Sequence, residues 1–129
     1  MSSSFADSAV ASLTVFDPQR LETLMELASD GDLATVLEIV HQFDEDSVAL
    51  LHRLSDWVAG DAFPEVASAA HSLKGSAGVF GFSRVEYAAV QLELAALNED
   101  RQNVGRWHSF IVDALPPAKE ELTRYFAAL

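Results

Sequence analysis

The stretch DLATVLEIVHQFDEDSVALLHRLSDWVAG, residues 32–60, indicates the fold class of this chain. Apolar residues recur in it at spacings of three and four, the period of an amphipathic helix, for about seven turns. The expected inward positions are Leu33, Val36, Leu37, Val40, Phe43, Ser47, Leu50, Leu51, Leu54 and Trp57 or Val58. At a rise of about 1.5 Å per residue, such a helix is about 40 Å long. We therefore predict one long helix between Asp32 and Gly60 that runs the height of a helical bundle.

Turn residues on either side of this stretch indicate two further helices. Asp17-Pro18 predicts a helix N-cap followed by a proline at the first helical position, and this short helix is expected to end near Gly31. Phe63-Pro64 begins another helix, which is expected to end near Gly81.

The C-terminal part of the chain predicts two more helices. Ser83 is the expected cap of the first, and residues 98–100 form the turn before the second. Pro116-Pro117 interrupts the last helix although its apolar period continues, which predicts either one kinked helix or two stacked segments. No strand pattern occurs and the turns are short. The predicted fold is therefore all-α, an antiparallel four-helix bundle with a short N-terminal helix and a long C-terminal helix.

The composition is that of one ordinary domain. Half of the 129 residues are apolar, so the chain can bury a single core, which we place in residues 13–129 after a flexible N-terminus of residues 1–12. The net charge of −12 comes with no basic cluster that would suit nucleic acid or an anionic membrane. Cysteine is absent, which excludes disulfides and thiolate sites. No signal peptide or membrane-spanning run is visible, and we predict a monomeric, cytoplasmic domain.

Function is indicated by the segment Ala70-His71-Ser72-Leu73-Lys74-Gly75-Ser76-Ala77-Gly78. On a helix, His71, Lys74, Gly75 and Gly78 share one face. The opposite face is apolar and predicts the buried side, which consists of Val66, Ala69, Ala70, Leu73, Ala77 and Phe80. A glycine inside a helix costs about 1 kcal/mol relative to alanine. Two glycines beside a histidine therefore indicate that something approaches the imidazole closely.

A neutral imidazole at this position is a nucleophile near neutral pH and can carry a phosphoryl group on nitrogen. Lys74, one turn away, can pair with phosphoryl oxygens as charge develops. An outward helix face has no cavity around it, so the pattern points to a protein partner that supplies the rest of the active site. The residues alone leave a plainer alternative open, a solvent-exposed histidine with glycines that serve helix packing.

The same residues resemble the histidine-containing phosphotransfer (HPt) domains of multistep phosphorelays. The resemblance rests on residues 70–77 with their HxLKGSA core, on Gly81 and on Leu92-Glu93 in the next helix, and it spans Leu13 to Leu97. Val79 departs from the family pattern, because many members have a polar residue at that position.

The resemblance implies a four-helix bundle that accepts a phosphoryl group from the aspartate of one receiver domain and passes it to another, without turnover of its own. His71 would be the phosphorylated residue, Lys74 would stabilise charge and Gly75 would admit the receiver. Glu93 stands where some members place a glutamine that orients the imidazole, so we expect its carboxylate to accept a hydrogen bond from Nδ1–H. The residues expected at the receiver interface are Ala67, Ser68, Ser72, Gly75, Gly78 and Arg84.

The implied partners are response-regulator receiver domains and a sensor histidine kinase, which includes the hybrid type. No cofactor is expected on this chain, since Mg²⁺ belongs to the receiver. Two other functions stay open, namely an adaptor that only binds a receiver and a histidine-bearing fragment of a hybrid or chemotaxis-type kinase. No metal site is predicted, because His41 and His52 are eleven residues apart and a helical metal pair needs a spacing of about four.

Overall fold

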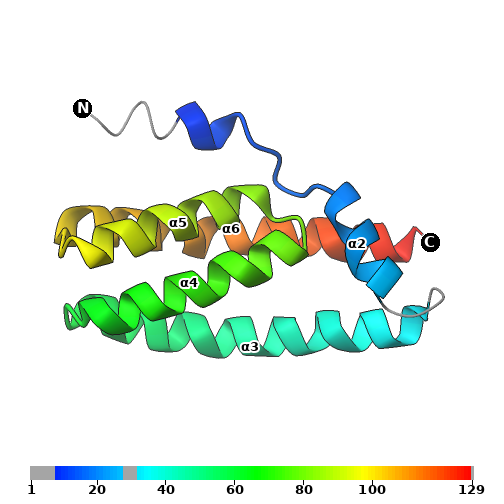
Figure 1. Cartoon of the computed structure of the whole chain (residues 1–129), viewed down its shortest axis with the longest axis horizontal. Coiled ribbons are helices and arrows are strands. Elements are labelled where there is room, and N and C mark those ends of the chain that lie inside the picture. The colour runs from blue at the N-terminus through cyan, green and yellow to red at the C-terminus, as the bar shows by residue number, and fades with distance from the viewer. Residues whose placement is uncertain (1–7, 28–31, 129) are drawn as a thin grey trace.

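The computed structural model describes residues 8–27 and 32–128. In this part of the chain the labelled elements are all helices, and they follow in the order α2 (Gln19–Leu27), α3 (Leu33–Ala59), α4 (Phe63–Val79), α5 (Ser83–Leu97) and α6 (Arg101–Ala127). Helices α3 to α6 run lengthwise and alternate in direction, whereas α2 crosses one end of the bundle (Figure 1). The prediction of an all-α, antiparallel four-helix bundle with a short N-terminal helix is confirmed. None of the described helices is long and apolar enough to cross a membrane.

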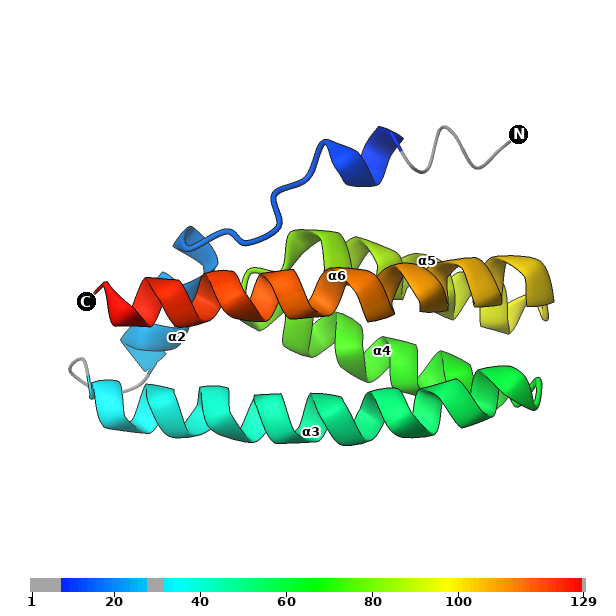
Figure 2. The same cartoon turned by 180° about the vertical axis from the view of Figure 1, so that it is seen from behind.

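Both long helices, α3 and α6, are continuous over their whole length. Helix α3 begins where the Asp32 carboxylate accepts a hydrogen bond from the Thr35 amide, and it ends at Gly60, as predicted. Helix α6 contains Pro116 and Pro117 and is nevertheless one helix from Arg101 to Ala127 (Figure 2). Proline has no amide N–H, so the carbonyl four residues before each proline loses its usual helical hydrogen bond. Both prolines are exposed, and these carbonyls can bind water instead. The alternative of two stacked segments is wrong.

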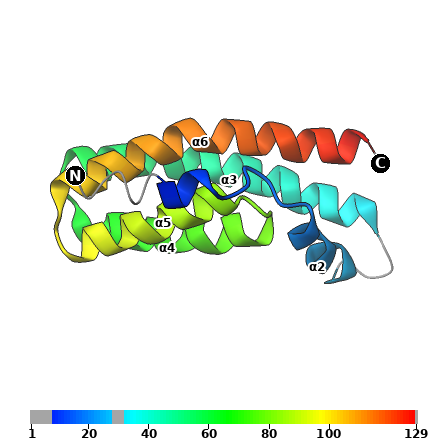
Figure 3. The same ribbon diagram turned by 90° about the horizontal axis from the view of Figure 1, so that it is seen from above.

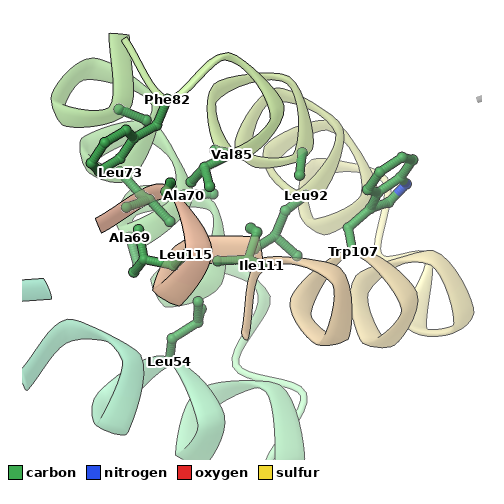
Figure 4. Packing of buried hydrophobic residues seen from close by; sticks show 14 of the residues in the cluster. Leu54, Ala69, Ala70, Leu73, Phe82, Val85, Leu92, Trp107, Ile111 and Leu115 are labelled. Atoms are coloured by element: carbon green, nitrogen blue, oxygen red, sulfur yellow. The ribbon is translucent and has the colours of Figure 1, made fainter. Parts of the chain in front are cut away.

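The core lies between α4, α5 and α6, with α3 closing it from the side (Figure 4). The face of α4 predicted to be inward is buried at all six positions, Val66, Ala69, Ala70, Leu73, Ala77 and Phe80. Alanines dominate where α4 meets α5, and small side chains at a helix contact allow the two axes to approach closely. This close approach brings the outward side chains of α4 within reach of those on α5.

The segment before α2 is fastened to the turn between α4 and α5. The Asp17 amide donates a hydrogen bond of 2.8 Å to the Gly81 carbonyl. Gly81 has a φ of +75°, and a β-carbon there would overlap the Asp17 carbonyl oxygen. The Phe16 ring packs edge-on against Phe82 and Tyr125. Glycine is therefore required at position 81 so that the two backbones can touch.

Two expectations about helix starts differ from the structure. Ser83 is the first residue of α5 and not its cap, and the preceding Phe82 makes no capping hydrogen bond through its side chain. The Asp17 carboxylate does accept a hydrogen bond from the Gln19 amide, but α2 begins at Gln19, one residue later than expected. The expected end of this helix near Gly31 lies outside the described residues.

The described part of the N-terminal segment contacts the bundle. Residues 8–11 form a helical turn, and Val10 is only 3% exposed. The Arg84 guanidinium donates hydrogen bonds to the carbonyls of Leu13 and Ala11, which holds the segment above α5 (Figure 3). The predicted flexibility of residues 1–12 stays a prediction from the sequence, and residues 1–7 lie outside the described part of the chain.

Candidate functional site

His71 lies on the outer face of α4 with 65% of its side chain exposed, and its Nδ1 is 3.0 Å from Oε2 of Glu93 on α5. A carboxylate only accepts hydrogen bonds, so the ring nitrogen facing it must carry the proton. The neutral imidazole is thereby held as the Nδ1–H tautomer, and Nε2 keeps its lone pair. The expected contact between Glu93 and the imidazole is present in the structure.

The Glu93 carboxylate is shared between two residues of α4. Its Oε1 lies 3.4 Å from Nζ of Lys74, while Oε2 faces His71. Glu93 is 22% exposed and Lys74 is 34% exposed, so this ion pair is partly screened by water and contributes about 0–1 kcal/mol to stability. Lys74 is therefore placed beside the imidazole by a weak contact that another anion can replace. The spacing of residues along α4 does not predict this pairing of Lys74 with a residue of α5.

The two glycines on the histidine face have different surroundings. A β-carbon built at Gly75 would meet no atom within 4 Å, so this position is open surface. A β-carbon at Gly78 would lie 2.7 Å from Oε2 of Glu86 and 3.2 Å from Nη2 of Arg20. Gly78 thus makes room for an ion pair of the chain itself. The place of Gly78 at the receiver interface stays a prediction, and Gly75 is the glycine of this face whose missing side chain leaves open space.

Arg20 and Glu86 form a two-pronged ion pair beneath Gly78. Nη1 of Arg20 is 2.6 Å from Oε1 of Glu86, and Nη2 is 3.2 Å from Oε2. The hydrogen bond with Glu86 raises the pKa of the Arg20 guanidinium, although burial opposes the rise. This pair joins α2 to α5 across the end of α4 and so fixes the position of α2 beside the histidine face.

An open groove runs between α2 and α4 next to this face. Its lining residues are Arg20, Thr23, Leu24, Lys74, Gly75, Gly78, Val79 and Glu86. Val79, which departs from the family pattern, is 47% exposed and forms part of the groove. We expected no cavity near the histidine, because an outward helix face has none of its own. The spacing of residues within α4 does not show that α2 lies beside this face and forms the other wall of the groove. The contribution of Thr23 and Leu24 was missed for the same reason.

The remaining residues expected at the receiver interface fall into two groups. Ser68 and Ser72 are exposed. Ala67 is only 7% exposed because it packs in the core, so it offers little surface to a partner. The Arg84 guanidinium donates a hydrogen bond to the backbone of the N-terminal segment. The roles of Ala67 and Arg84 at a receiver interface stay predictions from the sequence.

Other titratable residues lie away from the histidine face. His41 contacts Glu45 one turn away on α3, at 3.1 Å. His108 of α6 shares a contact of 3.1 Å with the Ser55 hydroxyl of α3, and burial lowers the pKa of this histidine. Among the described residues, no three histidine, cysteine or acidic side chains come together as a metal-binding group would.

The comparisons with known proteins agree with the site. A family model for the Hpt domain matches residues 12–124, a range that contains His71, Lys74, Gly75 and Glu93. The searches of curated proteins and of solved structures give no match. Hpt domains are helical phosphocarrier modules of two-component phosphorelays, and they interact with receiver domains and kinases. Because the match covers nearly the whole chain, this protein belongs to the Hpt domain family.

Proposed function

We propose that this chain is a phosphocarrier in a multistep phosphorelay, in which His71 accepts a phosphoryl group from the aspartate of one receiver domain and passes it to another. The observation that carries the proposal is the exposed imidazole whose Nδ1 faces Glu93 at 3.0 Å. This contact presents Nε2 as the nucleophile on a surface that a folded partner can reach.

The transfer step follows from this geometry. The Nε2 lone pair attacks the phosphorus of the aspartyl phosphate, the N–P bond forms, and the P–O bond to the aspartate breaks as its carboxylate leaves. The proton stays on Nδ1, where the negative charge of Glu93 stabilises the positive charge that develops on the ring. The reverse step needs no proton movement either, so the same arrangement serves both acceptance and donation.

Lys74 and the receiver supply the remaining charge compensation. Nζ of Lys74 is held 3.4 Å from Glu93 and can turn from it to the phosphoryl oxygens, which carry more negative charge than one carboxylate. Mg²⁺ is expected on the receiver, where it would neutralise the phosphoryl group from the other side. In this proposal the chain has no turnover of its own, because the metal and the second reacting group belong to the partner.

Access by the receiver depends on Gly75. The position is open to solvent and lies one turn from His71, beside exposed Ser72. A long side chain at Gly75 would stand between the imidazole and an approaching surface. We therefore expect the Gly75→Gln variant to fold with unchanged helicity and to lose transfer, and unimpaired transfer would contradict the access argument.

The decisive experiment measures phosphoryl transfer from a panel of phosphorylated receiver domains to this chain, with His71→Gln alongside. Acid-labile, alkali-stable label on the wild type alone supports the phosphocarrier. Binding of a receiver without any label, and undiminished by His71→Gln, would instead indicate an adaptor.

Glu93 is tested by two replacements that separate hydrogen bonding from charge. Glu93→Gln keeps an acceptor for Nδ1–H, whereas Glu93→Ala removes it and frees the ring to rotate. We expect Glu93→Ala to slow transfer about tenfold or more and Glu93→Gln to retain more activity. Transfer by Glu93→Ala at the wild-type rate would show that the carboxylate does not orient the imidazole.

The monomeric state and the cytoplasmic location of this chain stay predictions from the sequence.

A further inference from the structure

The side of α3 that faces α6 carries large apolar side chains in the open. Leu33 is 37% exposed, Leu37 is 43% exposed and Val48 is 51% exposed. Their spacings of four and eleven residues place them on one face of the helix, next to the face that is buried. Val112 on α6 is also a large apolar side chain that is exposed, at 41%.

One hydrogen bond and one ion pair connect α3 to α6, and an open groove lies beside the ion pair. Ser55 meets His108 at 3.1 Å, and Nζ of Lys119 lies 2.9 Å from Oδ1 of Asp44. The groove is lined by Leu37, Val40, His41, Phe43, Asp44, Lys119, Leu122 and Thr123. Phe43 and Leu122 are buried at its base, so its floor is apolar. The opposite charges of Lys119 and Asp44 cancel each other within their ion pair.

Carboxylates flank this groove on its solvent side. On α3, the helical positions next to the groove on its solvent side include Glu38 and Glu45. On α6, the corresponding positions include Asp113 and Glu120. All four side chains are exposed. Of these four, Glu45 contacts His41 at 3.1 Å, and Glu120 lies near Lys119 and Arg124 on α6. The groove therefore combines an apolar floor with acidic edges, in a chain whose net charge is −12.

We propose that this α3/α6 face docks a cationic amphipathic helix of a partner protein, with aliphatic side chains in the groove and lysine or arginine against the carboxylates. Positions 33 to 48 of α3 span about 22 Å, which matches a partner helix of about 15 residues, and the groove lies within this span at Leu37, Val40 and Phe43. A second copy of this chain is a poorer occupant, because it would bring two acidic edges together. The proposal does not depend on phosphotransfer.

The docking face and the histidine face lie on opposite sides of the bundle. Helices α4 and α5, which carry His71 and Glu93, form one side, and α3 and α6 form the other (Figure 3). A partner helix on α3/α6 would leave the imidazole accessible. The chain can then hold one partner while it exchanges phosphate with another.

A synthetic helix of leucine and lysine, about 15 residues long and amphipathic, serves as the probe. Its affinity for the full chain is measured by fluorescence anisotropy, and its location is mapped by amide chemical-shift changes. Leu37→Lys removes an apolar contact and adds a repelling charge, and it should weaken binding about tenfold. Ile39→Lys is the matched control, because Ile39 is 39% exposed on the same helix but faces away from the groove. It should weaken binding by less than about twofold.

Each other outcome contradicts the proposal. Equal weakening by both variants would show that the peptide binds only through the overall charge of the chain. Shift changes confined to α4 and α5 would place it on the histidine face, and binding of the same peptide with glutamate in place of lysine would refute the acidic-edge argument. A dimer that Leu37→Lys dissociates in sedimentation experiments would identify a second copy as the occupant. His71→Gln should bind the probe as the wild type does, which separates this test from the proposed function.

Discussion

Alanine at Gly75 should stabilise the protein, whereas alanine at Gly78 should not. Both residues lie inside α4, where alanine is favoured over glycine by about 1 kcal/mol. At Gly75 the new methyl group meets no atom within 4 Å, so nothing offsets this gain. We expect the free energy of unfolding to rise by about 0.5–1 kcal/mol.

At Gly78 the same gain is opposed by a displaced ion pair. The new β-carbon would lie 2.7 Å from Oε2 of Glu86, so this carboxylate must move away from Arg20. Weakening hydrogen bonds between charged, partly exposed groups costs about 1–2 kcal/mol. We therefore expect Gly78→Ala to leave the free energy of unfolding unchanged or to lower it by about 1 kcal/mol.

Urea titration monitored by circular dichroism measures the free energy of unfolding of both variants. Thermal unfolding gives a second estimate of the change in stability. A chain of 129 residues has an unfolding entropy of about 0.27 kcal/mol per kelvin, so Gly75→Ala should raise the midpoint by about 3 °C. In a Glu86→Ala background the obstruction is gone, and Gly78→Ala should then stabilise as Gly75→Ala does. A destabilising Gly75→Ala, or equal gains at both positions in the wild-type background, would refute the reasoning.

Three further predictions concern residues outside the histidine face. Gly81→Ala forces a β-carbon against the Asp17 carbonyl at a φ of +75°, and it should lower the free energy of unfolding by about 2–3 kcal/mol in urea titration; a loss under about 0.5 kcal/mol would contradict this. Burial lowers the pKa of His108, so below about pH 6.5 the unfolded chain binds more protons than the folded one, and stability should fall as the pH is lowered through this range. His108→Gln should flatten the dependence of the thermal midpoint on pH, and an unchanged slope would exclude His108 as its source. Arg84→Gln removes the hydrogen bond to the Leu13 carbonyl, and amide exchange in residues 8–13 should quicken while exchange in α4 and α5 stays as in the wild type; unchanged exchange in residues 8–13 would show that other contacts hold the segment.

Local spacing was sufficient to predict the helices and the inward face of α4. On α3 the apolar period also predicted Leu33 and Leu37 to be inward, and this was wrong, because they are 37% and 43% exposed. The angle of a side chain around a helix depends only on its position in that helix, so the inward set of α4 and the length of α3 follow from the apolar period. The contact between His71 and Glu93 was expected from the family resemblance, because no periodicity relates residues on two different helices.

Contacts between distant segments could not be predicted in this way. Arg20 meets Glu86 across 66 positions of sequence, and this contact changes the interpretation of Gly78. The Arg84 guanidinium donates a hydrogen bond to the Leu13 carbonyl across 71 positions, which gives it a partner within the chain. Periodicity shows that a residue faces outward, but it does not show which other part of the chain covers that face.

The contact between His71 and Glu93 has a consequence for how the site assembles during folding. The two residues are 22 positions apart and lie on helices joined by a short turn, so His71, Lys74 and Glu93 all belong to one helical hairpin. Closing so short a loop costs little chain entropy, and such local contacts form fast. The α4–α5 hairpin can therefore bring His71, Lys74 and Glu93 together before α6, which is synthesised after them, has packed against it.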